Sequence, residues 1–142
     1  MPDPSLGVLL FLPYRHLEQR VLDAVVAAGH PISLAQARVF QRVSPDGSRL
    51  TELAAAAQVT KQTAGFLVDQ LAASGYVERA PDPRDARARL VRITPRGFEA
   101  IAVAREVQER IEAEWRTHLG ERRFEDLRTT LLSLREITDP WA

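Results

Sequence analysis

The sequence predicts a mainly α-helical chain with a small β-hairpin between two groups of helices. Three observations support this fold class. Apolar residues recur at three- and four-residue spacing over most of the 142 residues. Two short segments, 76–80 and 89–94, instead read as strands on either side of a turn-rich loop. The tetrapeptide SPDG at residues 44–47, together with Gly29 and Gly120, separates the predicted helices.

The first helix is predicted from an apolar stripe over residues 6–28, with Ser5 as its N-cap. Pro13 interrupts this stripe because proline removes a backbone donor inside a helix. The pattern leaves two alternatives: one long helix kinked at Pro13, or a shorter helix that begins there.

Two shorter helices follow. Ser33 and Gln36 have the spacing of a capping box, which predicts a second helix that continues to residue 43. An alanine-rich third helix is expected from Thr51. Leu50, directly before it, is expected to form a very short strand beside the hairpin.

A fourth helix over residues 60–74, opened by Thr60, is predicted to carry a recognition surface. Because successive residues of a helix are rotated by about 100°, one face is apolar and comprises Ala64, Leu67, Val68 and Leu71. The opposite side and the first turn carry the other side chains, namely Lys61, Gln62, Thr63, Gly65, Phe66, Asp69 and Ala73.

The N-terminal end of this helix is suited to the DNA major groove. Lys61 can reach phosphate or guanine, Gln62 can pair with adenine, and Thr63 or Phe66 can pack on a thymine methyl group. We therefore expect DNA contacts from residues of this helix start, which are Thr60, Lys61, Gln62, Thr63, Gly65 and Phe66. The alternative is an ordinary solvated face with Phe66 folded back onto a neighbouring helix.

The hairpin loop supplies a second predicted DNA contact. Arg84, Arg87 and Arg89 lie in or beside its tip, and an arginine there can enter a minor groove. Asp82 and Asp85 are expected to hold an arginine fork in a fixed orientation. The alternative is a solvated hairpin whose charges neutralise one another. Helix, turn, helix and this two-stranded wing together form a winged helix-turn-helix pattern.

The segment TELAAAAQVTKQTAGFLVDQLAASGYVERAPDPRDARARLVRITPRG resembles the winged helix-turn-helix domain of the MarR family of bacterial transcription regulators. The most specific matches are DPRDAR, LVRIT and TPRG. The resemblance implies a homodimeric regulator, a recognition helix beginning near Thr60, a wing arginine at Arg87, and a small-molecule pocket between the DNA-binding and dimerisation parts. Two positions depart from the family pattern: Gln58 stands where glycine is common, and Ala86 where a first loop arginine is frequent.

The last two helices are predicted to be long and amphipathic. Thr94 and Pro95 begin the first of them, and Gly120 ends it. The final helix has a heptad-like seam, formed by Phe124, Leu127, Leu131 and Leu134. We expect these helices and the first one to form a two-fold dimer, since their apolar stripes are larger than the small DNA-binding part needs to cover its own core. The alternative is packing within one monomer.

Composition restricts the other function classes. Residues 49–97 contain eight basic and five acidic residues, while the rest of the chain has eleven basic and fourteen acidic ones. A modestly positive DNA reader on an acidic scaffold is therefore expected, with strongly salt-dependent binding. No apolar run is long enough for a membrane span and no signal peptide is recognisable, so a cytoplasmic protein without membrane contact is expected.

Neither catalysis nor a cofactor is expected. The chain has no cysteine, which excludes thiol-based oxidant sensing and thiolate zinc sites. His16, His30 and His118 lack metal-ligand spacing and are interpreted as structural or solvated, although a regulatory metal assembled from distant positions stays open. No nucleophile elbow or phosphate-binding loop is present, so no catalytic or metal residue is assigned.

An effector pocket is expected where the first, second and fifth helices approach the DNA-reading part. Tyr14, Phe40 and Trp115 are the candidate residues, because aromatic rings stack on a planar ligand. Core packing is the alternative for each. A small aromatic effector bound there would favour one spacing of the two recognition helices.

The predicted organisation is a DNA-binding domain at 49–97 and a helical dimerisation region at 1–48 and 95–142. The predicted function is a dimeric, ligand-responsive DNA-binding repressor that binds a palindromic operator. The alternative is a winged-helix module that binds protein and makes no DNA contact. Loop arginines favour DNA because they match phosphate.

Overall fold

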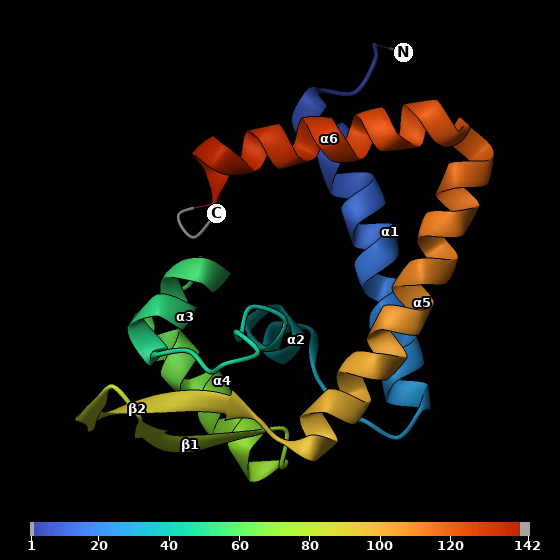
Figure 1. Cartoon of the computed structure of the whole chain (residues 1–142). Coiled ribbons are helices and arrows are strands. Elements are labelled where there is room, and N and C mark those ends of the chain that lie inside the picture. The colour runs from blue at the N-terminus through green and yellow to red at the C-terminus, as the bar shows by residue number, and fades with distance from the viewer. Residues whose placement is uncertain (1, 140–142) are drawn as a thin grey trace.

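The computed structural model describes residues 2–139, and within that range it contains six helices and one antiparallel two-stranded sheet (Figure 1). The elements in chain order are α1 (Leu6–Ala27), α2 (Leu34–Phe40), α3 (Leu50–Ala57), α4 (Lys61–Ala73), β1 (Val77–Asp82), β2 (Asp85–Ile93), α5 (Pro95–Leu119) and α6 (Glu121–Thr138). The predicted fold class, mainly helical with a small wing, is confirmed.

Most predicted caps are present. Ser5 Oγ accepts from Val8 N at 3.3 Å, so α1 begins where expected and runs through Pro13 as one long helix. The shorter alternative beginning at Pro13 is therefore wrong. Ser33 and Gln36 form the expected capping box, but α2 ends at Phe40 rather than at residue 43.

Two predictions about strands need correction. Leu50 is the first residue of α3, and the extra bridge to the hairpin is made by Ser48, whose backbone exchanges hydrogen bonds of 3.0 and 2.8 Å with Val91. Both hairpin strands also extend further toward the tip than expected, because the segment read as a loop pairs across the hairpin.

The residues from α2 to β2 form a compact unit, here called the head. Its core is a set of buried apolar side chains from α2, α3, α4 and the wing, including Val39, Leu53, Val68, Leu71 and Tyr76. Figure 1 shows the two strands lying along α4, with α2 and α3 on the other side of that helix. The head therefore positions α4 between its own core and the surface.

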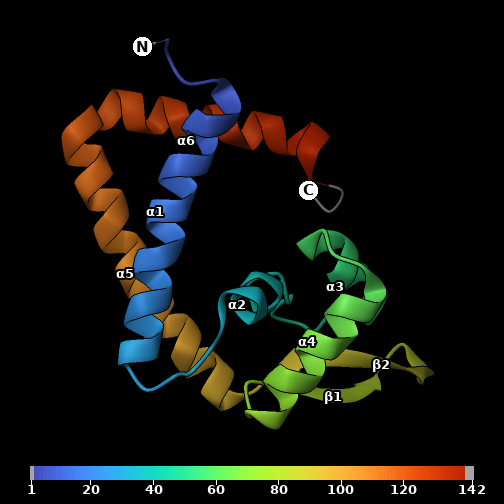
Figure 2. The same ribbon diagram turned by 180° about the vertical axis from the view of Figure 1, so that it is seen from behind.

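The long helices form the rest of the molecule. α1 packs along α5, where Arg20 Nη2 donates to Glu114 Oε1 at 2.9 Å. α6 turns back from the far end of α5 so that its C-terminal end lies above α3 (Figure 2 shows the same arrangement from behind). Gln58 Nε2 donates to the carbonyl oxygen of Thr138 at 3.4 Å across this approach.

A large apolar surface is exposed on α1 and α6. Phe11 is 57% exposed and Ile137 is 84% exposed. The other exposed large apolar residues of these helices are Leu6, Val8, Leu9, Leu10, Leu12, Tyr14, Val26, Leu127, Leu131, Leu132 and Leu134. Within residues 2–139, no helix is long and apolar enough to cross a bilayer.

Candidate nucleic-acid interface

Helix α4, predicted to be a recognition helix, has the orientation that its sequence pattern predicts. Ala64, Leu67, Val68 and Leu71 are buried, and they fix the helix against the head. Phe66 points outward and is 62% exposed, so the alternative in which it folds back onto a neighbouring helix is wrong. A large aromatic side chain is thus held in solvent on the outer face of α4.

The first turn of α4 is open to solvent. Thr60 Oγ1 accepts from Thr63 N at 3.1 Å, and the Thr60 hydroxyl donates to Thr63 Oγ1 at 2.9 Å. Lys61, Gln62 and Thr63 are all exposed beside this cap. Backbone N–H groups at a helix start attract anions, and here they lie next to a lysine ammonium group.

Gly65 has a different environment from its neighbours. It is half-buried, and a Cβ atom at this position would lie 3.6 Å from Leu50 Cδ2 at the start of α3. That distance is an ordinary van der Waals contact, so the packing of α3 against α4 does not require glycine at this position.

The turn between α3 and α4 is made by Gln58 in the left-handed conformation, with φ 58° and ψ 44°. Among the described residues it is the one non-glycine residue with positive φ. The sequence indicated that this turn must accept a side chain in place of glycine, and the structure accommodates it in the left-handed region.

The wing has a tighter tip than predicted. Pro83 and Arg84 form the turn, Asp82 pairs with Asp85, and Pro81 pairs with Arg89. Residues 86–88 therefore bulge out of the ladder, which displays Arg87 on an irregular part of β2. Bulges re-aim side chains and interrupt pairing at sheet edges.

The three predicted wing arginines lie on this part of the hairpin. Arg84, Arg87 and Arg89 are exposed, and no ion pair within residues 2–139 engages their side chains. Asp85 instead accepts a hydrogen bond from the backbone N of Arg87 at 3.0 Å. The alternative of a self-neutralised hairpin is therefore not what the structure shows for these three guanidinium groups.

Asp82 does hold an arginine fork, but the arginine comes from outside the wing. Its Oδ2 accepts from Arg49 Nε and Nη2 at 3.0 and 2.9 Å, and its Oδ1 accepts from the backbone N of Arg84 at 2.9 Å. The hydrogen bond from Arg84 and then the Arg49 guanidinium lower the pKa of Asp82. Arg49 thus anchors the wing tip to the start of α3.

Sequence reasoning missed Arg49 as a site residue. It is separated from Asp82 by 33 residues, and nothing local to either residue identifies the other as its partner. The sequence indicated only that an aspartate in this basic loop would hold an arginine. It did not indicate which arginine binds Asp82.

A buried aromatic cluster lies at the base of the wing. Tyr76 is fully buried, its hydroxyl accepts from Arg96 Nη2 at 3.0 Å, and it lies 3.1 Å from His30 Nδ1. Phe40 packs edge-on against the Tyr76 ring with centroids 6.2 Å apart. Gly97 is required here, because a Cβ atom would lie 2.3 Å from the carbonyl oxygen of Tyr76. His30 therefore has a packing role.

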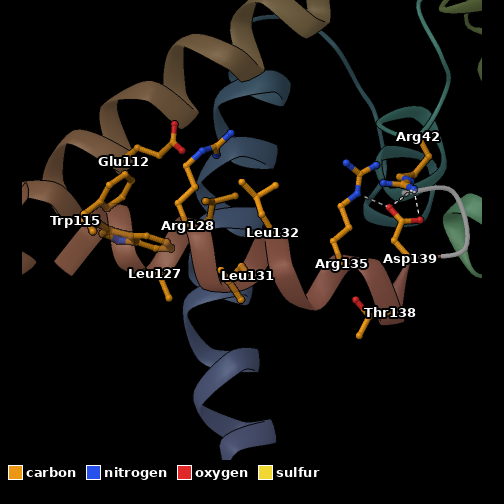
Figure 3. Close-up of a pocket in the computed structure, with 12 residues that line it drawn as sticks. Arg42, Glu112, Trp115, Leu127, Arg128, Leu131, Leu132, Arg135, Thr138 and Asp139 are labelled. Carbon is orange, nitrogen blue, oxygen red and sulfur yellow. Dashed lines mark hydrogen bonds and ion pairs between the residues drawn. The ribbon is translucent and has the colours of Figure 1, made fainter. Parts of the chain in front are cut away.

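The three aromatic residues predicted to line an effector pocket do not meet. Phe40 belongs to the cluster at the base of the wing, and Tyr14 lies on α1, where its hydroxyl donates to Glu18 Oε2 at 2.6 Å. Burial, followed by that hydrogen bond, raises the pKa of Tyr14. Trp115 alone of the three lines a cavity of about 470 Å³ between α5 and α6 (Figure 3).

This cavity is lined on one side by apolar residues and on the other by arginines. Leu127, Leu131 and Leu132 of α6 line it together with Trp115. Arg42 and Arg135 lie at the opposite end, whereas Arg128 lies beside Glu112 at the Trp115 end (Figure 3). Within residues 2–139, no group of three or more histidine, aspartate or glutamate side chains is arranged to hold a metal ion.

Comparison with known proteins supports the interpretation of the head. Residues 30–88 match the model of the MarR family. No curated protein matches the chain. Among solved structures, the chain is similar to the transcriptional regulator Tm0710 from Thermotoga maritima, with 27% identity, 92% of each chain covered and a TM-score of 0.62.

Two further solved structures share the fold and contain a bound molecule. CouR from Rhodococcus jostii RHA1, bound to p-coumaroyl-CoA, is 23% identical, with a TM-score of 0.72 over 92% of this chain and 91% of that one. A MepR variant from S. aureus, bound to an oligodeoxyribonucleotide, is 17% identical, with a TM-score of 0.60 over 94% of this chain and 98% of that one.

Proposed function

Because this chain is a MarR-family protein with a winged helix-turn-helix head, we propose that it is a homodimeric repressor that binds a palindromic operator. In this proposal α4 enters the major groove and the wing enters the adjacent minor groove. Residues 49–97 serve as the DNA-binding domain, and residues 1–48 and 95–142 serve as the dimerisation region. The protein acts in the cytoplasm, where it meets chromosomal DNA.

One observation carries the DNA-binding part of this proposal. The exposed first turn of α4 and the exposed wing arginines belong to the same head, and the apolar face of α4 is buried in its core. Arg49 is bound by Asp82 and Arg96 by Tyr76, so these guanidinium groups support the head. Arg84, Arg87 and Arg89 have no such partner among the described residues and suit phosphate or a narrow minor groove.

The residues proposed to contact DNA are those that the sequence singled out, and Gly65 stays among them as a position where the backbone can approach DNA. Lys61, Gln62, Thr63 and Phe66 are the proposed major-groove contacts, and Thr60 acts by capping the helix. We expect Phe66 to pack against a thymine methyl group, because this contact would remove the exposed ring from water.

The dimer is supported by the exposed apolar surface of α1 and α6. A monomer seldom exposes a contiguous apolar patch of this kind, and burial against a second copy would remove it from water. A two-fold dimer also presents two α4 helices to successive major grooves, which is what a palindromic site requires.

An effector pocket is proposed in the cavity beside Trp115. An indole ring stacks favourably on a planar ligand, and the cavity volume lies in the range of small-molecule sites. Binding there would weaken DNA binding if the ligand favours a spacing of the two heads that does not match the operator.

The DNA upstream of the chain's own gene provides the test. Fluorescence anisotropy of a labelled duplex should show binding whose affinity falls steeply between 50 and 200 mM salt, as expected when several phosphate contacts release counterions. A Lys61→Ala variant should bind more weakly at every salt concentration. Failure to retain any duplex at low salt, together with capture of a protein partner through Phe66, would favour the protein-interaction alternative.

A further inference from the structure

The chain passes between the head and the long helices at two places within residues 2–139. The first is the connection from α1 to α2, residues 28–33, and the second is Thr94 between β2 and α5 (Figure 1). Both connections meet at one buried residue, Tyr76, which lies between α4 and β1. The contacts of Tyr76 therefore bear on how the head is oriented relative to the long helices.

The Tyr76 hydroxyl contacts a residue beside each of these connections. His30 Nδ1 in the first connection lies 3.1 Å from the hydroxyl, and the two rings meet edge-on with centroids 5.6 Å apart. Arg96 in the first turn of α5 donates to the hydroxyl from Nη2 at 3.0 Å, and its guanidinium carbon lies 4.6 Å from the centre of the Tyr76 ring. One hydroxyl thus links the end of α1 and the start of α5 to the head.

The donor and acceptor roles of this hydroxyl follow from its partners. A guanidinium group has only N–H donors, so the Tyr76 oxygen accepts from Arg96. Tyr76 is 0% exposed, and a buried hydroxyl hydrogen without an acceptor is unfavourable. His30 Nδ1 lies at hydrogen-bonding distance, so Tyr76 donates to it. His30 is half-buried and Arg96 is exposed, so water can replace the hydroxyl for both of them if it is removed.

The backbone beside Tyr76 holds the start of α5 in place. Thr94 N donates to the Tyr76 carbonyl oxygen at 3.2 Å, and the Thr94 hydroxyl donates to the carbonyl oxygen of Gly75 at 2.5 Å. Gly97 fits against the same Tyr76 oxygen because it has no Cβ atom. These contacts lie at one point, so they fix the position of the first turn of α5 and not the direction in which the head extends from it.

Apolar contacts between the head and the long helices leave this direction adjustable. Within residues 2–139, no helix of the head packs along the length of a long helix. Val25 of α1 and Ala100 of α5 do join the buried core of the head. Apolar burial is not directional, so these contacts tolerate a small rotation of the head.

The ion pairs between the head and the long helices are open to water. Arg38 binds Glu18 of α1, and Arg42 binds Asp139 at the end of α6. The Arg38 side chain is exposed and that of Arg42 is half-buried, and solvent weakens ion pairs of this kind. The Tyr76 hydroxyl is buried, so its two hydrogen bonds are the directional contacts that water does not reach.

We propose that the Tyr76 hydroxyl is a positioning group for operator binding and sets the orientation of the head on the long helices. Rotation of the head about its base would break the hydrogen bond to His30 or the one from Arg96. In the dimer this orientation determines the separation of the two α4 helices. The inference rests on the proposed DNA-binding dimer and adds the residue that determines which half-site spacing the dimer binds.

Pulsed electron paramagnetic resonance tests the orientation without DNA. The chain has no cysteine, so Gln62→Cys on α4 and Thr117→Cys on α5 give two exposed sites for spin labels, one on the head and one on the long helices. Doubly labelled chains diluted with unlabelled chains report the distance within one protomer. Tyr76→Phe keeps the buried ring and removes the hydroxyl, so the distance distribution should become broader and its mean should shift.

The preferred spacing of operator half-sites is the second readout. Half-sites are first selected from random duplexes by the parent chain, and their separation is then lengthened or shortened by one base pair. One base pair rotates a half-site by about 35° around the DNA axis, so a rigid dimer should prefer one separation. Tyr76→Phe should bind the preferred duplex about tenfold more weakly and lose most of the preference, with unchanged affinity for a single half-site.

Two further variants complete the experiment. Tyr14→Phe is the matched control, because it removes the same group from α1, where Glu18 keeps its hydrogen bonds from Arg38. It should show the parent's label distances and spacing preference. Arg96→Gln, at an exposed position, removes the other side of the contact and should act in the same direction as Tyr76→Phe, which covers a failure of Tyr76→Phe to fold.

Label distances equal to the parent's in Tyr76→Phe and Arg96→Gln would overturn the proposal. An unchanged spacing preference would also overturn it, since a purely stabilising role would lower the affinity for all duplexes alike. A parent chain that selects no duplex would contradict the proposed function itself, and the label distances would still confirm or refute the orienting role of Tyr76.

Discussion

At the scale of single residues, the head depends on backbone positions as much as on side chains. Gly97 lies against the Tyr76 carbonyl at a distance that excludes a Cβ atom, and Gln58 adopts a conformation that glycine would adopt more readily. The first feature explains why the motif TPRG ends in glycine. The second, the left-handed backbone of Gln58, is unfavourable locally, and the surrounding packing holds the residue in that conformation.

Gln58 provides a prediction for stability. The free energy of unfolding should be larger for Gln58→Gly than for Gln58→Ala by about 1 kcal/mol, so that the glycine variant is the more stable, because glycine enters the left-handed region without Cβ strain. Both variants lack the hydrogen bond to Thr138, so their comparison isolates the backbone effect. Urea unfolding followed by circular dichroism measures it; an alanine variant as stable as the glycine variant would show that this turn is not strained.

At the scale of elements, ion pairs connect helices that the apolar pattern cannot place relative to one another. Glu18 on α1 accepts from Arg38 of α2 at 2.9 and 3.0 Å and from Arg15 at 2.6 Å. The hydrogen bonds from Arg38 lower the pKa of Glu18 to about 2 from an ordinary value of 4.5. This cluster attaches the head to the first long helix.

The Glu18 cluster predicts a pH dependence of stability. The folded state holds Glu18 deprotonated to lower pH than the unfolded state does, so its contribution is complete above about pH 4.5 and is lost as the pH falls toward 2. Glu18→Gln should therefore destabilise the chain by about 1 kcal/mol at pH 6, a value limited by solvent screening. The difference from the parent should shrink at pH 3. A difference that is the same at both pH values would exclude the ion pair as its source.

Elements also show how far the sequence could predict this molecule. Periodicity and caps identified all six helices of the described chain, since Ser5, Ser33, Thr60 and Thr94 each bond the helix that they precede. Strand ends were less predictable: a turn-rich composition concealed the pairing of Asp82 with Asp85. The bridge at Ser48 depends on tertiary packing, and no local pattern indicates it.

The candidate site divides in the same way. The outward direction of Lys61, Gln62 and Phe66 follows from helical geometry alone, so the sequence was sufficient for it. Partners distant in sequence were not predictable, which is why Arg49 and the Arg42–Asp139 contact were missed. The aromatic residues proposed for one pocket were grouped by residue type, and the fold separates them.

At the scale of the whole molecule, the exposed apolar face of α1 and α6 is the surface that we propose binds a second copy of the chain. Its side chains would be unusual on an isolated chain, whereas the head is well packed by itself. In the proposed function the long helices hold two copies together and the head binds DNA. The contacts between α6 and the head would connect these two proposed roles.

Dimerisation can be tested on this face. Phe11→Glu places a charge within the proposed interface and should raise the dimer dissociation constant at least about thirtyfold, corresponding to about 2 kcal/mol. Sedimentation equilibrium should then give the protomer mass of 15.9 kDa in place of twice that value. Ala73→Glu, an exposed position on the head, is the matched control and should remain dimeric. Parent chains that sediment as monomers would remove the basis for a palindromic site.

The most direct measurement of the central claim is the salt dependence of operator binding by the parent and by Arg87→Ala. If α4 and the wing grip DNA, the slope of the logarithm of affinity against the logarithm of salt concentration should become shallower by about 1 to 2, since each dimer loses two guanidinium groups. Arg122→Ala, an exposed substitution on α6, should leave affinity and slope unchanged. An Arg87→Ala dimer that binds the operator with the parent's affinity and slope would contradict the account.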